Sequence, residues 1–176
     1  MAKTDSLKSI SRETRAMPPR LIFDIAAIDM ERVIFDQEAI RQVNCQRGDM
    51  EHLDGIIWVN PEQDQILGYK DVRHDEFWVP GHIPGKPLLP GVIMIEAGGQ
   101  IASFYMRKFL GWDGFIGFGG VEECKFRQMV EPGVRLHLLA QKISERHGRL
   151  TSAVQGVVRG DLVFEAKIMG IQMGPG

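Results

Sequence analysis

The stretch PGHIPGKPLLPG (80–91), followed directly by VIMIEAGGQIASFYMRKF (92–109), decides the fold of this chain. The first twelve residues contain four prolines and three glycines, which exclude a helix or a central strand and predict a stiff loop. The residues that follow are apolar on nearly every side, which predicts one long helix over 90–110 that is surrounded by protein. Pro90 suits the first turn of this helix, and Gly111 suits its end.

Strand-like segments lie on both sides of the predicted helix. Before it, GIIWV (55–59) and QILGYKDV (65–72) flank the turn composition NPEQD, which predicts a hairpin. A short helix is expected over 36–43, with Asp36 as its N-cap. After the long helix, four antiparallel strands are expected at 115–130, 134–148, 149–160 and 161–173. One long helix with this much sheet indicates an α+β fold in which the sheet curls around the helix.

The length of 176 residues indicates one domain over 36–176, preceded by an N-terminal extension over 1–35. Residues 21–29 of that extension are too apolar to be free in water, so we expect them to pack on the domain or on another subunit. No apolar run is long enough to span a bilayer, and residues 1–16 lack the apolar stretch of a signal peptide. These features predict a soluble, cytoplasmic protein.

Charge and cysteine content narrow the possible function. The chain has 21 Lys and Arg against 23 Asp and Glu, a net charge of −2, which argues against a nucleic-acid partner. Cys45 and Cys124 are too few for a disulfide framework, and we expect both to be small buried residues. His74, Asp75 and Glu76 lack the paired short spacing of metal ligands, so we expect a charge cluster there and no metal. The sequence also has no glycine-rich phosphate loop, and we expect no cofactor.

Glu96 is the unusual residue of the long helix, because it lies in the middle of an apolar segment. Burying an ionised carboxylate without partners is costly, so this side chain is expected to be protonated, paired or functional. The alternative is that Glu96 faces a single solvated stripe, but Val92 and Phe104 share its face and argue against one. Gln100 lies one turn further on, where it could hydrogen-bond the carboxyl group and orient it.

His82 and Gly91 complete a candidate site. Flanking glycine and proline residues fix His82 in the loop, although a single loop histidine is more often an ordinary surface residue. Together with a neutral Glu96, it would provide a general base and a general acid at neutral pH. The free N–H group of Gly91 at the helix start could stabilise a developing oxyanion, or Gly91 could simply form a tight turn.

The segment GHIPGKPLLPGVIMIEAGGQ (81–100) resembles the signature of the bacterial β-hydroxyacyl-acyl-carrier-protein dehydratases, the FabZ/FabA group. That signature reads roughly GHFPxxPxxPGxxxxEAxxQ, and the similarity extends over about 36–170. The resemblance implies the hotdog fold, in which an antiparallel sheet wraps around one long central helix. Because position 96 is Glu rather than Asp, the chain looks closest to the FabZ branch, which dehydrates without isomerising the double bond.

The resemblance also implies a reaction and an assembly. A (3R)-3-hydroxyacyl group on an acyl carrier protein would lose water to give the trans-2-enoyl product, in fatty acid or related lipid biosynthesis. His82 would be the base, Glu96 the acid, Gly91 the oxyanion donor and Gln100 a support for Glu96. A homodimer, alone or as part of a trimer of dimers, would build two tunnels, each with His82 from one subunit and Glu96 from the other.

Because acyl carriers are acidic, we expect a basic surface at the tunnel mouth, for which Lys125 and Arg127, or Arg107 and Lys108, are candidates. The alternative is that these are ordinary solvated charges. The chain departs from the family pattern at several positions. Ile83 replaces a phenylalanine, Val134 replaces an aspartate, and Cys45-Gln46-Arg47-Gly48 retains only the arginine of a Pro-His-Arg tripeptide.

Three other functions remain open. A hotdog acyl thioesterase would use a carboxylate and a water molecule and would not need His82. A non-catalytic hotdog subunit would bind acyl chains or a partner, and the intact pair of His82 and Glu96 argues against it. An enoyl-CoA hydratase of related fold would carry a histidine two residues after Asn60-Pro61, where this chain has Gln63.

Overall fold

The computed structural model describes residues 20–174, which form one antiparallel sheet, one long helix and short helical turns. The strands of the sheet follow the order β1-β2-β3-β5-β6-β7-β4. Their bounds are β1 Phe35–Asp36, β2 Gly55–Asn60, β3 Gln65–Val72, β4 Ile116–Phe126, β5 Val134–Arg146, β6 Arg149–Val158 and β7 Asp161–Gln172. The helices are α1 Gln37–Arg41 and α2 Gly91–Phe109, with 3-10 turns at Gly48–Met50 and Pro61–Gln63.

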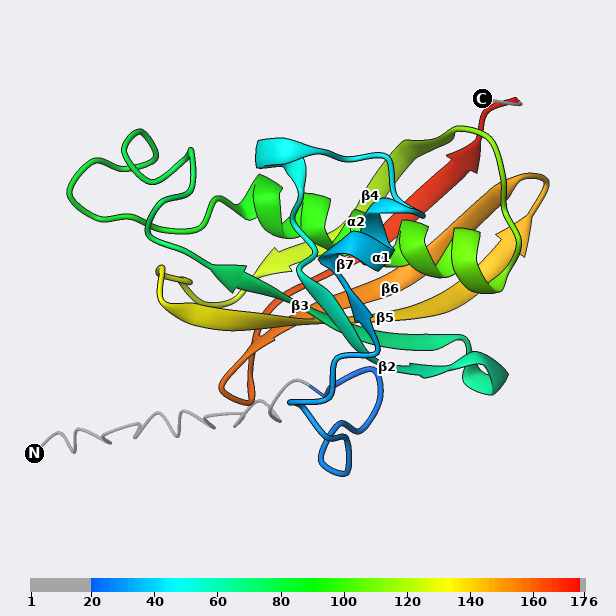
Figure 1. The fold of residues 1–176 in the computed structure, drawn as a ribbon, viewed down its shortest axis with the longest axis horizontal. Coiled ribbons are helices and arrows are strands. Elements are labelled where there is room, and N and C mark those ends of the chain that lie inside the picture. The colour runs from blue at the N-terminus through cyan, green and yellow to red at the C-terminus, as the bar shows by residue number, and fades with distance from the viewer. Residues whose placement is uncertain (1–19, 175–176) are drawn as a thin grey trace, which may run out of the picture.

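Helix α2 crosses one face of the sheet, which curls around it (Figure 1). Ala97, Ile101 and Phe104 on this helix are completely buried against the strands, because the apolar helix face and the apolar sheet face remove each other from water. This is the hotdog arrangement, so the expected fold class is confirmed. The expected helix is also confirmed, with Pro90 as its N-cap residue and Gly111, at φ +70°, just after its end.

The shorter elements also follow the expected turn chemistry. Asp36 caps α1, since its Oδ1 atom accepts a hydrogen bond from the Ala39 N–H at 2.9 Å. The β2–β3 hairpin closes through the 3-10 turn Pro61–Gln63, after which Asp64 adopts the left-handed conformation. The β5–β6 turn has positive φ at both His147 and Gly148, which matches the twist of the paired strands.

Glycines allow α2 and the sheet to approach closely. A Cβ atom at Gly98 would lie 3.1 Å from the Ile168 side chain, and one at Gly99 would lie 2.8 Å from the ring of Phe118. On the sheet side, a Cβ atom at Gly68 would lie 3.1 Å from the side chain of Ile101 on α2. The helix glycines therefore reduce helix propensity but permit this packing, as the sequence predicts.

The N-terminal segment (residues 20–34) covers the opposite face of the sheet (Figure 1). Its Ile22 N–H donates to Gln155 Oε1 at 2.8 Å, and Gln155 Nε2 donates back to the Arg20 carbonyl at 3.2 Å. The ring of Phe23 lies 5.4 Å from that of Trp58. The expectation that this apolar segment packs on the domain is confirmed. This outer-face cluster consists of Phe23, Ile57, Leu67, Tyr69, Leu139, Val157 and Leu162.

One stripe of α2 is not covered within the single chain. Val92 is 70% exposed, and Glu96 and Ser103 on the same stripe are half-buried. The sequence predicts a helix that is surrounded by protein, and a single chain covers it only in part, because β4 is the last strand of the sheet and leaves this stripe open. No helix within residues 20–174 is long and apolar enough to cross a membrane.

Candidate active site

The loop between β3 and α2 holds His82 in a defined orientation. Its Nδ1 atom lies 2.8 Å from the carbonyl oxygen of Leu88, which can only accept a hydrogen bond. We therefore assign the ring proton to Nδ1, which leaves the lone pair of Nε2 available as a base. The backbone N–H of His82 donates to the Trp78 carbonyl at 2.8 Å, and Ile83 next to it has φ +57°. The loop thus fixes both the backbone and the ring.

His82 lines a cavity of about 450 Å³ together with the start of α2. The ring of Phe126 lies over Gly91, where a Cβ atom would be 2.6 Å from the nearest ring atom, so only glycine fits without moving the ring. The N–H groups of Ile93 and Met94 donate to the Pro90 carbonyl. Among residues 20–174, no acceptor is in hydrogen-bonding position for the Gly91 N–H, so it can bind a negatively charged oxygen.

Glu96 lines a second cavity, of about 220 Å³, beside the middle of α2. Its Oε1 atom accepts a hydrogen bond from Gln100 Nε2 at 2.8 Å and another from Gln46 Nε2 at 3.3 Å. The expected contact between Gln100 and Glu96 is therefore present. The rest of the cavity wall is mainly apolar or small, including Gly99, Ala102, Met106, Phe118, Leu150 and Ile168.

Gln100 is the centre of a buried hydrogen-bond network. It is 2% exposed, its Oε1 atom accepts from the His52 N–H at 2.8 Å, and its Nε2 atom also donates to the Met50 carbonyl at 2.7 Å. Its own carbonyl accepts from Asn44 Nδ2 at 2.9 Å. Sequence reasoning did not find Asn44, Gln46 or His52, because they lie in an irregular segment about fifty positions before Gln100.

His82 and Glu96 line different cavities within one chain. His82 lies before the start of α2 and Glu96 lies on its exposed stripe. A single chain therefore holds both predicted catalytic groups without bringing them to one cavity.

A buried ion pair anchors the loop that carries His82. Lys70 Nζ lies 2.8 Å from Glu76 Oε2, and the two side chains are 1% and 5% exposed. Burial raises the pKa of Glu76, but hydrogen bonds from Lys70, the Arg73 N–H and Trp78 Nε1 outweigh it, so this pKa lies below its ordinary value. Residues 20–174 contain no group of three or more potential metal ligands. Glu76 of the predicted charge cluster instead joins β3 to the loop.

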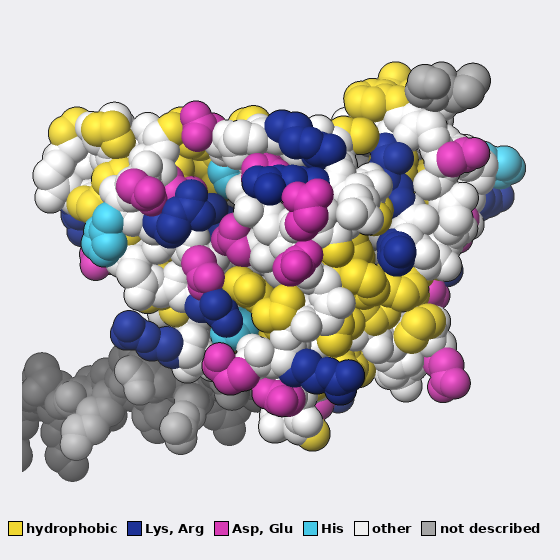
Figure 2. Space-filling model, viewed as in Figure 1, with side chains coloured by type: hydrophobic (Ala, Val, Ile, Leu, Met, Phe, Trp, Pro, Cys, Tyr) yellow, Lys and Arg dark blue, Asp and Glu magenta, His cyan; other side chains and the backbone are white. Residues whose placement is uncertain are grey.

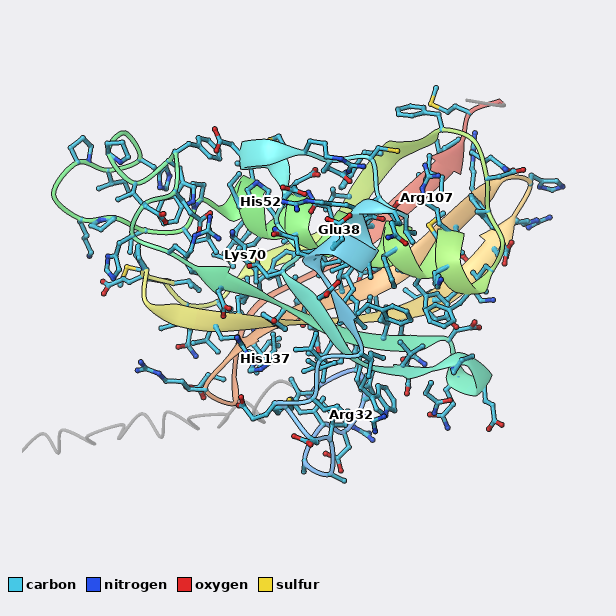
Figure 3. All side chains as sticks on the ribbon, in the orientation of Figure 1. Arg32, Glu38, His52, Lys70, Arg107 and His137 are labelled. Carbon is cyan, nitrogen blue, oxygen red and sulfur yellow. The ribbon has the colours of Figure 1, made fainter. Side chains whose placement is uncertain are left out.

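His52 lies at the same end of the sheet as Lys70 (Figure 3). Both ring nitrogens of His52 are buried without a hydrogen-bond partner among the described residues. Burial and the positive charge of Lys70 lower the pKa of His52, so the ring is neutral at neutral pH.

The basic side chains expected to dock a carrier already have partners. Glu165 accepts a hydrogen bond from Arg127 and lies 3.9 Å from Lys125 Nζ. Arg107 is half-buried and donates to the Gly114 carbonyl at 2.8 Å, while Lys108 lies over the ring of Phe35.

A groove at the β5–β6 hairpin is more basic than the surface around Lys125 and Arg127. It has a volume of about 540 Å³, and its wall contains Arg146, His147 and Arg149 together with Ser144 and Thr151. No carboxylate contributes to this wall, so its positive charge is not offset inside the groove.

Comparison with known proteins agrees with this fold. A family model described as a FabA-like domain matches residues 44–167, more than half of the chain. The 3-hydroxyacyl-(acyl-carrier-protein) dehydratase FabZ of Listeria monocytogenes is 34% identical over 138 residues, covering 77% of this chain and 94% of that protein. The FabZ of Mannheimia succiniciproducens is 36% identical over 115 residues, covering 63% of this chain and 76% of that protein.

Solved structures share the fold at low sequence identity. The dehydratase heterocomplex ApeI:P from Xenorhabdus doucetiae superposes with a TM-score of 0.65 at 15% identity, covering 77% of this chain and 91% of that chain. A hypothetical thioesterase with coenzyme A from Streptococcus pneumoniae gives a TM-score of 0.54 at 12% identity, covering 68% and 85%. From the match to the family model and from the FabZ relatives, the chain belongs to the FabA-like family.

Proposed function

We propose that this protein removes water from (3R)-3-hydroxyacyl groups carried by an acyl carrier protein, giving trans-2-enoyl groups. The observation that carries the proposal is the His82 cavity, where His82 Nε2 and the helix N–H of Gly91 have no hydrogen-bond partner among residues 20–174. A base next to an oxyanion donor is the arrangement that proton abstraction beside a thioester carbonyl requires. The FabZ relatives are named as 3-hydroxyacyl-(acyl-carrier-protein) dehydratases, which is this activity.

The proposed reaction uses two side chains, one backbone N–H group, solvent and the substrate. Nε2 of His82 takes the proton from C2 of the acyl group, and the electron pair moves onto the thioester oxygen, where the Gly91 N–H stabilises it. The C2–C3 double bond then forms as the C3–O bond breaks. Glu96 donates a proton to the leaving hydroxyl group, which departs as water. Solvent then returns a proton to Glu96 and removes one from His82.

The Glu96 cavity suits the acyl chain. Its wall combines the small residues Gly99 and Ala102 of α2 with the apolar side chains of Leu150 and Ile168 from the sheet. An alkyl chain in this cavity would remove from water both its own apolar surface and that of the cavity wall. The carboxyl group of Glu96 at the cavity wall would then lie close to C3 of the substrate.

A homodimer would bring the separated residues together, with His82 of one subunit and Glu96 of the other in one tunnel. The exposed stripe of α2 and the edge strand β4 support this assembly, because Val92, Phe118 and Phe126 present apolar surface that one chain leaves uncovered. Hydrophobic side chains also reach the surface next to the C-terminus (Figure 2), where Phe115 and Met173 are more than half exposed.

For the acidic carrier we propose docking at basic side chains, with two candidate surfaces. Lys125 and Arg127 share the single carboxylate of Glu165, so they retain part of their positive charge. Arg146 and Arg149 line the groove without a carboxylate and offer the stronger positive surface. Charge reversal is tested at Arg149 and, separately, at Lys125. Reversal on the surface that docks the carrier should raise the KM for a carrier-bound substrate and leave the KM for a pantetheine thioester unchanged.

The reaction is tested by incubating the protein with 3-hydroxyacyl carriers of several chain lengths and following the products by mass. Loss of 18 Da from the acyl group, the mass of one water molecule, would support dehydration. Release of free carrier would instead identify a thioesterase, and an unchanged substrate would identify a binding subunit. His82→Ala and Glu96→Gln are each expected to slow dehydration by a factor of about 10² to 10⁴ in a folded protein.

The shared tunnel has its own test. Co-expression of the His82→Ala and Glu96→Gln chains would produce mixed dimers with one intact pair of catalytic residues, so activity should partly return from two inactive parents. Mixed dimers without activity would mean that both residues act within one chain.

A further inference from the structure

The hydrogen bonds around Gln100 have only one possible direction. The His52 N–H can only donate, and it lies 2.8 Å from Gln100 Oε1. The Met50 carbonyl can only accept, and it lies 2.7 Å from Gln100 Nε2. These two backbone groups fix which end of the side-chain amide is nitrogen. The second N–H of Nε2 must therefore donate to Glu96 Oε1, at 2.8 Å.

A second amide approaches the same carboxyl oxygen. Gln46 Nε2 lies 3.3 Å from Glu96 Oε1, and Gln46 lines the same cavity as Glu96. Arg47 holds this segment in place, because its guanidinium group donates to the Asn44 carbonyl at 2.8 Å, to the Arg41 carbonyl at 2.7 Å and to the Gln46 carbonyl. The Gln46 backbone is thus tied to its neighbours while its side chain points to Glu96.

We propose that Gln46 is a positioning residue which, together with Gln100, directs the acid proton of Glu96 to Oε2. In a protonated carboxyl group one oxygen is a hydroxyl donor and the other is the better acceptor. Two N–H donors on Oε1 make that atom the acceptor and leave the proton on Oε2. The inference rests on the proposed function, because it assigns the atom that protonates the departing hydroxyl group.

This role predicts a specific kinetic effect. Gln46 would act on proton delivery and not on substrate affinity, so its loss should lower kcat and leave KM unchanged. Gln46→Met keeps the length of the side chain but has no N–H donor. Losing one hydrogen bond to the acid is expected to lower kcat about tenfold. Gln46→Glu, also of equal length, offers a competing acceptor and should lower kcat further.

The experiment compares Gln46→Met and Gln46→Glu with the wild-type protein and with Glu96→Gln. The thermal midpoint of each variant shows whether it is folded. A normal kcat in folded Gln46→Met, with Glu96→Gln inactive, would overturn the inference and leave the proposed function standing. A raised KM with normal kcat would also overturn it, because Gln46 would then contact the substrate. An active Glu96→Gln would contradict the proposed function itself.

A second measurement does not depend on activity. In protein labelled with ¹³C at glutamate carboxyl carbons, the resonance absent from Glu96→Gln identifies Glu96. Its chemical shift should change in Gln46→Met if the amide donates to this carboxyl group. An unchanged shift in the folded variant would overturn the inference whatever the reaction proves to be.

Discussion

Among single residues, His52 and His137 make the folded protein sensitive to acid. They lie on opposite faces of the sheet, His137 on the side of the N-terminal segment (Figure 3). Burial lowers the pKa of both, and the positive charges of Lys70 and Arg135 lower them further. The unfolded chain therefore takes up protons near pH 6.5, where the folded protein still holds both rings neutral.

The free energy of unfolding should therefore be undiminished above about pH 6.5 and should decrease as the pH falls below this value. The total decrease is about 1.4 kcal/mol for each unit by which folding lowers the pKa of a histidine. Urea unfolding at pH 7.5 and 5.5 measures this difference. His52→Leu should reduce the difference, because it removes a ring whose buried nitrogens have no partner among the described residues. His147→Gln changes an exposed histidine of the β5–β6 turn and serves as the control. Equal pH dependence in wild-type and His52→Leu protein would refute this account.

Residue-level sequence reasoning found Glu96 and its contact with Gln100 because the two lie one helical turn apart. Gln46 could not be found in this way. Its contact with Glu96 joins positions 50 residues apart through an irregular segment, and no periodic pattern describes such a segment. The directions of the hydrogen bonds at Gln100 likewise depend on two backbone groups that only the fold brings together.

At the level of elements, the close packing of β3 against its neighbouring strand β2 and against α2 depends on Gly68. A Cβ atom there would meet the Gly55 carbonyl at 2.7 Å and the Ile56 and Ile101 side chains at 2.9 and 3.1 Å. A backbone carbonyl in a sheet cannot move aside, so Gly68→Ala should destabilise the protein by about 2–3 kcal/mol. Gly81→Ala is the matched control, because nothing lies within 4 Å of a Cβ atom at that position. Urea unfolding compares the two, and equal stabilities would mean that the contact relaxes at no cost.

The elements themselves were predictable, whereas the irregularities within them were not. Apolar periodicity and turn residues placed the long helix and the hairpins close to their observed bounds. Strand β4 contains register shifts between Phe118 and Gly120 and between Glu122 and Lys125, with Glu123 at φ +51°. A bulge adds one residue on one strand only, so it depends on the pairing partner and leaves no clear periodic signal.

For the whole molecule, the N-terminal segment is a structural part of the fold. Removing residues 1–34 would expose Leu67, Leu139 and Val157 on the outer face of the sheet. The shortened protein should be less stable and should self-associate through this apolar face. Removal of residues 1–19 alone keeps the contacts of Phe23 and Ile22 and provides the control. Thermal unfolding measures the stability, and light scattering measures the self-association. If the protein without residues 1–34 is as stable and as monodisperse as the control, the N-terminal segment is not a structural part of the fold.

The separation of His82 and Glu96 into two cavities has a consequence for how activity scales with enzyme concentration. If a tunnel forms only when two chains meet, the fraction of working sites follows mass action. Specific activity, measured per chain, should then fall on dilution below the dissociation constant of the dimer. It should return when inactive Glu96→Gln chains are added at high concentration, since each supplies His82 to a wild-type Glu96. A specific activity independent of dilution, in protein shown by sedimentation to be dissociated, would mean that one chain is sufficient.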